Sequence, residues 1–95
     1  MTIFVLTCID KPNSLELRMA TRPAHLAYMA ANNRGVKLGG PFLDAKGDMA
    51  GSMILIEADD ISAVEALTAS DPYALAGLFE RVEIRAWRPT IGQLP

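Results

Sequence analysis

The pattern of apolar and polar positions predicts four β-strands along the chain. Ile3–Ile9 and Gly51–Glu57 alternate with a period of two and are apolar on both faces, which is typical of central strands covered on both sides. Val36–Leu43 is predicted to be a strand that contains two glycines and a proline, a composition found at sheet edges and bulges. Phe79–Trp87 is the last predicted strand. A hairpin loop at Asp44–Gly47 joins the second strand to the third.

A long helical segment lies between the first two strands. It covers approximately Leu15–Asn33, and Ser14 is placed to act as its N-cap. Pro23 interrupts this segment, and a proline inside a helix lacks an amide donor and disfavours helical geometry in the preceding residue. The sequence therefore predicts either a kink at Arg22 or two helices, the second beginning at Pro23. Gly35 is expected to end the segment as a left-handed cap.

Helical spacing returns after the third strand. Asp59 or Asp60 is expected to cap a helix in which apolar residues repeat at helical intervals. Those apolar residues are Ile61, Val64 and Leu67. A short helical turn is predicted to start at Ser70–Tyr73, with Pro72 at the tolerated first position, and to end near Gly77. The tail over residues 88–95 is expected to extend over the surface or over a partner.

The predicted order of elements is β-α-β-β-α-β, with one extra helical turn before the last strand. Two split βαβ units of this length predict a single α+β domain over residues 1–95 with the ferredoxin-like sandwich fold. Both helices would cover one face of the sheet, whereas the two central strands are apolar on both faces. A second copy of the chain would bury the open face, so the sequence predicts a homodimer with face-to-face sheets.

The composition excludes several classes of function. The 95 residues carry a formal net charge of −2 with a pI near 5.2, which gives no general attraction to nucleic acid or to an anionic membrane. The longest apolar runs are strand-sized, and the N-terminal residues lack the basic region of a signal peptide. We therefore expect a cytoplasmic protein that binds neither nucleic acid nor membrane.

The sequence contains no pattern typical of a metal or cofactor site. Cys8 is the only cysteine and lies in an apolar strand, so it is expected to be a buried, inert thiol. A single histidine with scattered acids lacks the clustered ligands of a zinc or iron site. The glycines match no phosphate-binding motif. The sequence therefore predicts no metal and no cofactor.

His25 is the only histidine of the chain, and histidine is the side chain that most readily exchanges a proton near neutral pH. It follows Arg18 and Arg22 at helical spacing, so the three groups would share one stripe of an unbroken helix. Either arginine is suited to bind a carboxylate or to stabilise an enolate. Ordinary structural explanations compete with these roles. His25 could be a solvated helix residue, and Asp71 could simply be the N-cap of the short turn.

Further candidates for contact with a small molecule lie in three other segments. Ser52 is near the start of the third strand, Tyr73 lies in the short helical turn, and Gly40 and Pro41 interrupt the second strand. Each has a structural alternative: a small polar residue at a strand start, a packed ring, and the protection of a sheet edge.

Five motifs occur in order along the chain, and together they give the sequence a family resemblance. They are Arg22–Tyr28, Gly39–Asp44, Gly47 with Gly51 and Ser52, Asp71–Tyr73 with Gly77–Phe79, and Val82–Trp87. This combination resembles the YCII-related (YciI-like) family over almost the whole chain. The resemblance implies a ferredoxin-like fold in a dimeric α/β barrel, with a pocket around a histidine–aspartate pair. By motif match, the pair is His25 and Asp71, and the Gly40, Pro41 and Ser52 positions line the pocket.

One characterised branch of that family eliminates chloride from chlorinated hydroxyhydroquinones, but the resemblance implies no particular substrate for this chain. An aspartate bound to one ring nitrogen of a histidine fixes its tautomer and raises the basicity of the other nitrogen. The first hypothesis is therefore a cofactor-free acid–base enzyme of the lyase or isomerase type, acting on a small aromatic or enolisable molecule. The alternatives are a non-catalytic protein that binds a small molecule, and a cofactor-free monooxygenase-like barrel protein.

Overall fold

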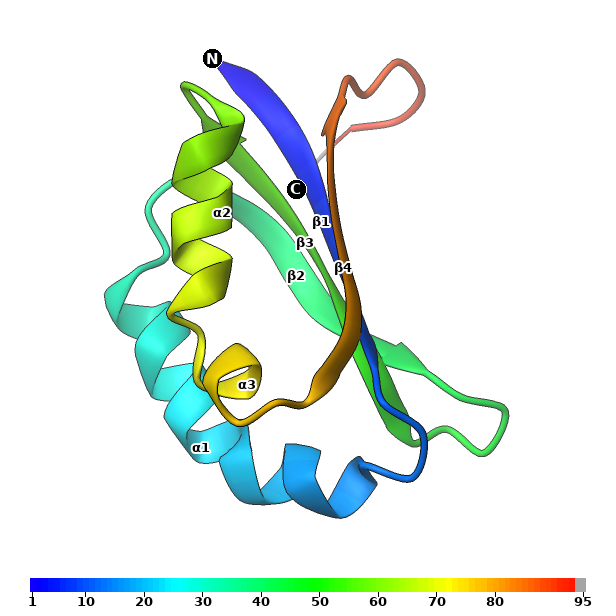
Figure 1. Cartoon of the computed structure of the whole chain (residues 1–95). Coiled ribbons are helices and arrows are strands. Elements are labelled where there is room, and N and C mark those ends of the chain that lie inside the picture. Colours follow the sequence, from blue (N-terminus) through cyan, green and yellow to red (C-terminus); the bar gives the residue numbers. More distant parts are fainter. Residues whose placement is uncertain (94–95) are drawn as a thin grey trace.

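The computed structural model describes residues 1–93 and contains four strands and three helices in that range (Figure 1). The last two residues of the predicted tail, 94–95, lie outside the described residues. The elements are β1 (Thr2–Asp10), α1 (Leu15–Ala31), β2 (Val36–Leu43), β3 (Met49–Ala58), α2 (Ile61–Ala69), α3 (Pro72–Leu75) and β4 (Phe79–Trp87). No helix of the described part is long and apolar enough to cross a membrane.

The four strands form one antiparallel sheet in the order β2-β3-β1-β4. The first strand in the sequence is therefore central, with Leu6 paired to Ile54 on one side and to Ile84 on the other. Strand β3 is also central, and it begins at Met49, two residues before the predicted start. This order, with the connections β1-α1-β2 and β3-α2-β4, is the ferredoxin-like arrangement of two split βαβ units. The predicted α+β fold is confirmed.

The core lies on the sheet face that the helices cover (Figure 1). Its buried apolar cluster combines alternate residues of β1 and β3 with one residue of α2, as expected from the period of two. The cluster consists of Phe4, Leu6, Cys8, Ile54, Ile56 and Val64. No helix of residues 1–93 covers the other face, where the exposed fractions of Leu38, Met53 and Trp87 are 46%, 37% and 42%.

The helix α1 is continuous through Pro23, so the prediction of two separate helices was wrong. Proline lacks an amide hydrogen, and its ring crowds the carbonyl one turn earlier, which bends a helix without always ending it. Figure 1 shows α1 changing direction along its length. Because the helix is unbroken, Arg18, Arg22 and His25 belong to one element, and the stripe that the spacing predicts for an unbroken helix is formed.

The expected caps are only partly formed. Ser14 occupies the N-cap position of α1 but donates its hydroxyl to Pro12 instead of accepting a bond from the helix. The C-cap of that helix is Asn32, so the cap predicted at Gly35 was wrong. Gly35 instead has φ +83°, and a side chain there would collide with the Glu57 carbonyl. This close approach of β2 to β3 explains why a glycine is needed.

Candidate active site

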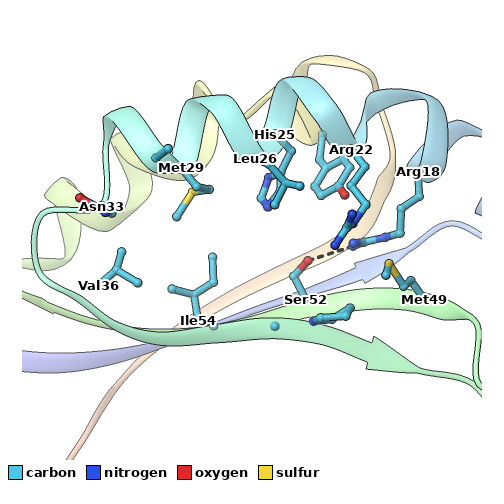
Figure 2. Close-up of a pocket in the computed structure, with 15 residues that line it drawn as sticks. Arg18, Arg22, His25, Leu26, Met29, Asn33, Val36, Met49, Ser52 and Ile54 are labelled. Atoms are coloured by element: carbon cyan, nitrogen blue, oxygen red, sulfur yellow. Dashed lines mark hydrogen bonds between the residues drawn. The ribbon is translucent and has the colours of Figure 1, made fainter. Parts of the chain in front are cut away.

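A cavity of about 380 Å³ lies between α1 and the sheet. Its walls come from α1, β2, β3 and the short helix α3, and Figure 2 shows side chains of α1 pointing toward side chains that rise from β3. The lining is formed by Arg18, Arg22, His25, Leu26, Met29, Ala30, Asn33, Val36, Gly39, Gly40, Pro41, Met49, Ser52, Ile54 and Tyr73. This volume and the mixture of apolar walls with a few polar groups are typical of sites for small organic molecules.

His25 and Asp71 meet at the wall of this cavity. The Nδ1 atom of His25 lies 2.9 Å from Oδ1 and 3.0 Å from Oδ2 of Asp71. Oδ1 also accepts the backbone N–H of Tyr73 at 2.9 Å, so the same carboxylate caps α3. Asp71 is therefore the N-cap that the sequence allowed, and the same side chain also lies within hydrogen-bond distance of His25. The cap fixes the carboxylate, and the carboxylate in turn orients the imidazole ring.

The ring of Tyr73 connects this pair to Arg18. It stacks on the imidazole of His25, with 4.1 Å between the ring centroids and 19° between the planes. The guanidinium carbon of Arg18 lies 4.4 Å from the centroid of the same ring, a cation–π distance. Arg18 and His25 are seven positions apart on α1, or about 10 Å of helix rise, so the Tyr73 ring fits between them. Tyr73 is only 1% exposed and sets the distance between the two groups.

Arg18 is held by a buried ion pair that the sequence reasoning missed. Its Nε donates to Oδ2 of Asp10 at 2.6 Å, and its Nη2 donates to Oδ1 at 3.1 Å and to the Ser52 hydroxyl at 2.9 Å. Arg18 is 2% exposed. Asp10, at the end of β1, is buried with it. The period of two that buries Phe4, Leu6 and Cys8 also points Asp10 inward, and this signal could have identified it.

The structure brings all the residues predicted to contact a small molecule to the same cavity. Arg22, Gly40, Pro41, Ser52 and Tyr73 all line it. Pro41 pairs with Ser52 across β2 and β3, and a proline is tolerated there because β2 is an edge strand. Within residues 1–93, no three acidic, histidine or cysteine side chains come together as a group that could hold a metal.

The arrangement of this site is suited to proton transfer, because a carboxylate holds the imidazole that faces the cavity. Because Asp71 engages Nδ1, the Nε2 atom of His25 is the one left to exchange a proton with a bound molecule. Burial raises the pKa of the Tyr73 hydroxyl, although the charges of Arg18 and Arg22 oppose the shift. Burial, helped by the charge of Asp71, raises the pKa of Cys8 to about 12. The thiol is therefore protonated near neutral pH and is no nucleophile.

The YCII-related domain model matches residues 2–88. The chain belongs to the YCII-related family. It is 32% identical over 94 residues to the protein YciI of Escherichia coli O6:H1, strain CFT073, which covers 90% of this chain and 96% of that protein. An uncharacterised protein of Haemophilus influenzae is 30% identical over 93 residues, covering 90% of this chain and 95% of that one. The family resemblance of the sequence motifs is confirmed.

Solved structures with this fold include a member with a named reaction. The 5-chloro-2-hydroxyhydroquinone dehydrochlorinase TftG from Burkholderia phenoliruptrix AC1100, in complex with 2,5-dihydroxybenzoquinone, is 33% identical with a TM-score of 0.85, over 90% of this chain and 93% of that one. A protein of Bacteroides thetaiotaomicron grouped with the antibiotic biosynthesis monooxygenases is 17% identical with a TM-score of 0.61, over 99% and 93% of the two chains. The second likeness shows the fold alone.

Proposed function

We propose that the chain is a cofactor-independent acid–base enzyme of the lyase or isomerase type, acting on a small aromatic or enolisable molecule in the cavity beneath α1. The observation that carries this proposal is the His25–Asp71 pair at the cavity wall, with a ring nitrogen 2.9 Å from the carboxylate. A histidine oriented in this way can both accept and return a proton within one reaction cycle. No other group at the wall has this property near neutral pH.

In the proposed reaction, Nε2 of His25 takes a proton from an O–H or C–H bond of the substrate. The electron pair left behind forms a new π bond. In an elimination, a leaving anion such as chloride departs with its bonding pair, so the net loss is one molecule of acid. In an isomerisation, the proton returns to another atom of the same molecule. Asp71 stabilises the imidazolium that exists between the two steps.

The substrate is proposed to contact Arg22, Gly40, Pro41, Ser52 and Tyr73, because all five line the cavity. The likeness to TftG, whose reaction is the dehydrochlorination of 5-chloro-2-hydroxyhydroquinone, supports a planar, oxygen-rich substrate and an elimination. The apolar part of the lining, including Met29 and Ile54, suits the ring of such a molecule.

We further propose that the protein is a homodimer in which a second copy covers the open face of the sheet. The support for this proposal is the row of partly exposed apolar side chains on that face, among them Leu38 and Met53. Apolar patches that no element of the same chain covers are common at interfaces between copies.

The proposed enzyme is tested with 5-chloro-2-hydroxyhydroquinone under anaerobic conditions, with chloride release as the readout. We expect turnover by the unchanged chain and a loss of at least 100-fold in kcat for His25→Ala and Asp71→Asn. Asp60→Asn is the matched control, because Asp60 also caps a helix but is exposed and does not line the cavity. It should keep full activity.

Three results would contradict the proposal or choose an alternative. Full activity of both site variants removes the dyad mechanism. Recovery of a tightly bound, chemically unchanged ligand without any turnover in a wider substrate screen favours a binding protein. Consumption of oxygen with a hydroquinone substrate, measured with an oxygen electrode, favours a monooxygenase. Elimination and isomerisation need no oxygen.

A further inference from the structure

The charged side chains that face the cavity all carry positive charge. Arg18 and Arg22 line it beside His25, whereas neither Asp10 nor Asp71 belongs to the lining. Both carboxylates stand behind the groups that they bind, since Asp10 holds Arg18 and Asp71 holds His25. A molecule entering the cavity therefore meets the cations first, while the compensating negative charges are kept away from it.

Arg18 has hydrogen-bond donors left over for such a molecule. Its Nε–H and both hydrogens of Nη2 are used by Asp10 and Ser52. Within residues 1–93, the other terminal nitrogen, Nη1, makes no hydrogen bond, and no side-chain nitrogen sealed from solvent lacks a partner. Nη1 therefore keeps some access to solvent, and Arg18 lines the cavity, so this nitrogen has two hydrogens that no protein group uses. The ion pair with Asp10 fixes the plane of the guanidinium, so these donors are already oriented.

Ser52 is oriented by the same network. Its oxygen accepts a hydrogen bond from Arg18, shown as the dashed line in Figure 2. A hydroxyl that accepts from a cation still has its own hydrogen to donate, and Ser52 points from β3 into the space below α1 in that view. The serine therefore adds a third donor beside the guanidinium.

Arg22 completes the group. It lies one helical turn after Arg18, lines the cavity, and forms no salt bridge with any residue of the described range. In Figure 2 its side chain extends in the same direction as that of Arg18, toward Ser52. An arginine that is partly buried and unpaired beside a cavity is suited to bind an anion there.

We propose that Arg18, Arg22 and Ser52 form a binding site for an anionic oxygen of the substrate, separate from the proton-exchanging nitrogen of His25. The chemistry recognised is that of a conjugated oxyanion, meaning a carboxylate, a phenolate or an enolate. The role in turnover rests on the proposed function, whereas the binding of the anion does not. Arg18 acts as the oriented donor, and Arg22 supplies the charge that attracts the ligand.

The test measures binding without turnover by isothermal titration calorimetry with two probes. The first is 2,5-dihydroxybenzoquinone, which is ionised at neutral pH because it is a vinylogous carboxylic acid. The second is its uncharged 2,5-dimethoxy ether, which keeps the ring and the carbonyl oxygens. We expect the unchanged chain to bind the anion at least tenfold more tightly than the ether.

The site is located with variants of the residues at the cavity and with one control variant outside it. Arg22→Gln and Ser52→Ala should weaken binding of the anion about tenfold or more and leave the ether unaffected. Arg34→Gln is the control, because this arginine is exposed and does not line the cavity, and it should change neither affinity. His25→Ala should still bind the anion. Arg18→Gln leaves Asp10 buried without a partner and can fail to fold, so the conclusion is drawn from the other variants.

Equal affinity of the two probes, the absence of anion binding at millimolar concentration, or equal effects of Arg22→Gln and Arg34→Gln would each overturn the assignment. These outcomes are independent of the proposed reaction. Anion binding with no turnover leaves the oxyanion site standing and removes the enzyme. Turnover that is insensitive to the Arg22 and Ser52 substitutions supports the enzyme and removes the role of the oxyanion site in its reaction.

Discussion

Asp71 links the stability of a helix to the orientation of the His25 imidazole. Oδ1 accepts the Tyr73 amide and also approaches Nδ1 of His25. Because Tyr73 carries both the capped amide and the ring that stacks on the imidazole, a change in this turn moves both contacts of the histidine together. The position of His25 is thus determined by residues 46 or more positions away in the sequence.

The buried thiol of Cys8 is expected to make the folded state less stable at alkaline pH. Burial raises its pKa from 9.0 to about 12, so the folded state holds the proton more tightly than the unfolded state. The resulting stability is fully present below pH 9 and is lost as the pH rises toward 12. Between pH 9 and 11, we expect the free energy of unfolding of the unchanged chain to fall by about 1.4 kcal/mol per pH unit more than that of Cys8→Ala. Urea unfolding at each pH measures the difference, and parallel curves for the two proteins would contradict it.

Removing both partners of the Asp10–Arg18 pair is predicted to destabilise the fold less than the sum of the two single removals. Asp10→Asn leaves Arg18 buried without its counter-charge and is expected to cost about 3–5 kcal/mol of unfolding free energy. The double variant Asp10→Asn with Arg18→Met removes both charges and should lose less than the sum of the two single variants. A double-mutant cycle in urea measures this coupling. Strict additivity would show that the pair contributes no interaction of its own.

At the scale of elements, Pro23 bends α1 between the two residues that hold the Tyr73 ring. Arg18 precedes the bend and His25 follows it, so the direction of the helix sets how these groups approach the ring. A proline in a helix interior costs about 3 kcal/mol or more, and part of that cost returns through the restricted unfolded chain. The bend therefore lowers the stability of the helix while it orients Arg18 and His25 toward the Tyr73 ring.

Replacing Pro23 tests whether the bend lowers stability and supports ligand binding. Pro23→Ala is expected to raise the free energy of unfolding by about 1–3 kcal/mol and to weaken the binding of 2,5-dihydroxybenzoquinone. Pro72→Ala is the matched control for stability, because Pro72 occupies the first turn of α3, where proline is tolerated. It should change stability by less than about 1 kcal/mol. Thermal unfolding and calorimetry provide the two readouts. A Pro23→Ala protein with unchanged stability and affinity contradicts this account.

The sequence predicted every strand and both main helices, because each depends on periodicity within a few residues. It failed where the outcome depends on the competition between local and distant contacts. Pro23 disfavours a helix locally, yet the segment is helical throughout, and Arg18 and His25 on either side of it contact distant residues. The partners of Arg18 lie 8 and 34 positions away, so no local spacing could pair them. The prediction that His25 and Asp71 pair likewise rested on family motifs, because the two residues are far apart in the sequence.

At the scale of the whole molecule, the two faces of the sheet differ in how they are covered. The helices bury Phe4 and Leu6 on one face, whereas Val5 on the other is only partly buried. Its neighbours on the same face are Leu55 of the central strand β3 and Arg85 of the edge strand β4. Apolar side chains bordered by charged residues are the usual form of an interface between copies.

We expect light scattering at micromolar concentration to give about twice the 10.3 kDa mass of one chain. Val5→Lys places a charge at the centre of the open face and should shift the mass toward that of the monomer. Ala66→Lys introduces the same charge on the exposed side of α2 and should leave the mass unchanged. A monomeric mass for the unchanged chain would rule out the proposed homodimer.

The helix α1 has a single buried residue, Arg18, because the cavity separates much of it from the sheet. Most of the apolar cluster, including Val64 of α2, lies outside the cavity lining, although Ile54 belongs to both and Met29 packs against the cluster. Substitutions at Leu26 or Ala30, which are exposed and line the cavity, can therefore reshape the cavity while most of the folding contacts persist. Such a division lets descendants of one ancestral chain acquire new ligands by a few changes in one helix. Differences between relatives are accordingly expected at the cavity-lining positions that follow the shared Arg22–Tyr28 motif, such as Ala30 and Asn33.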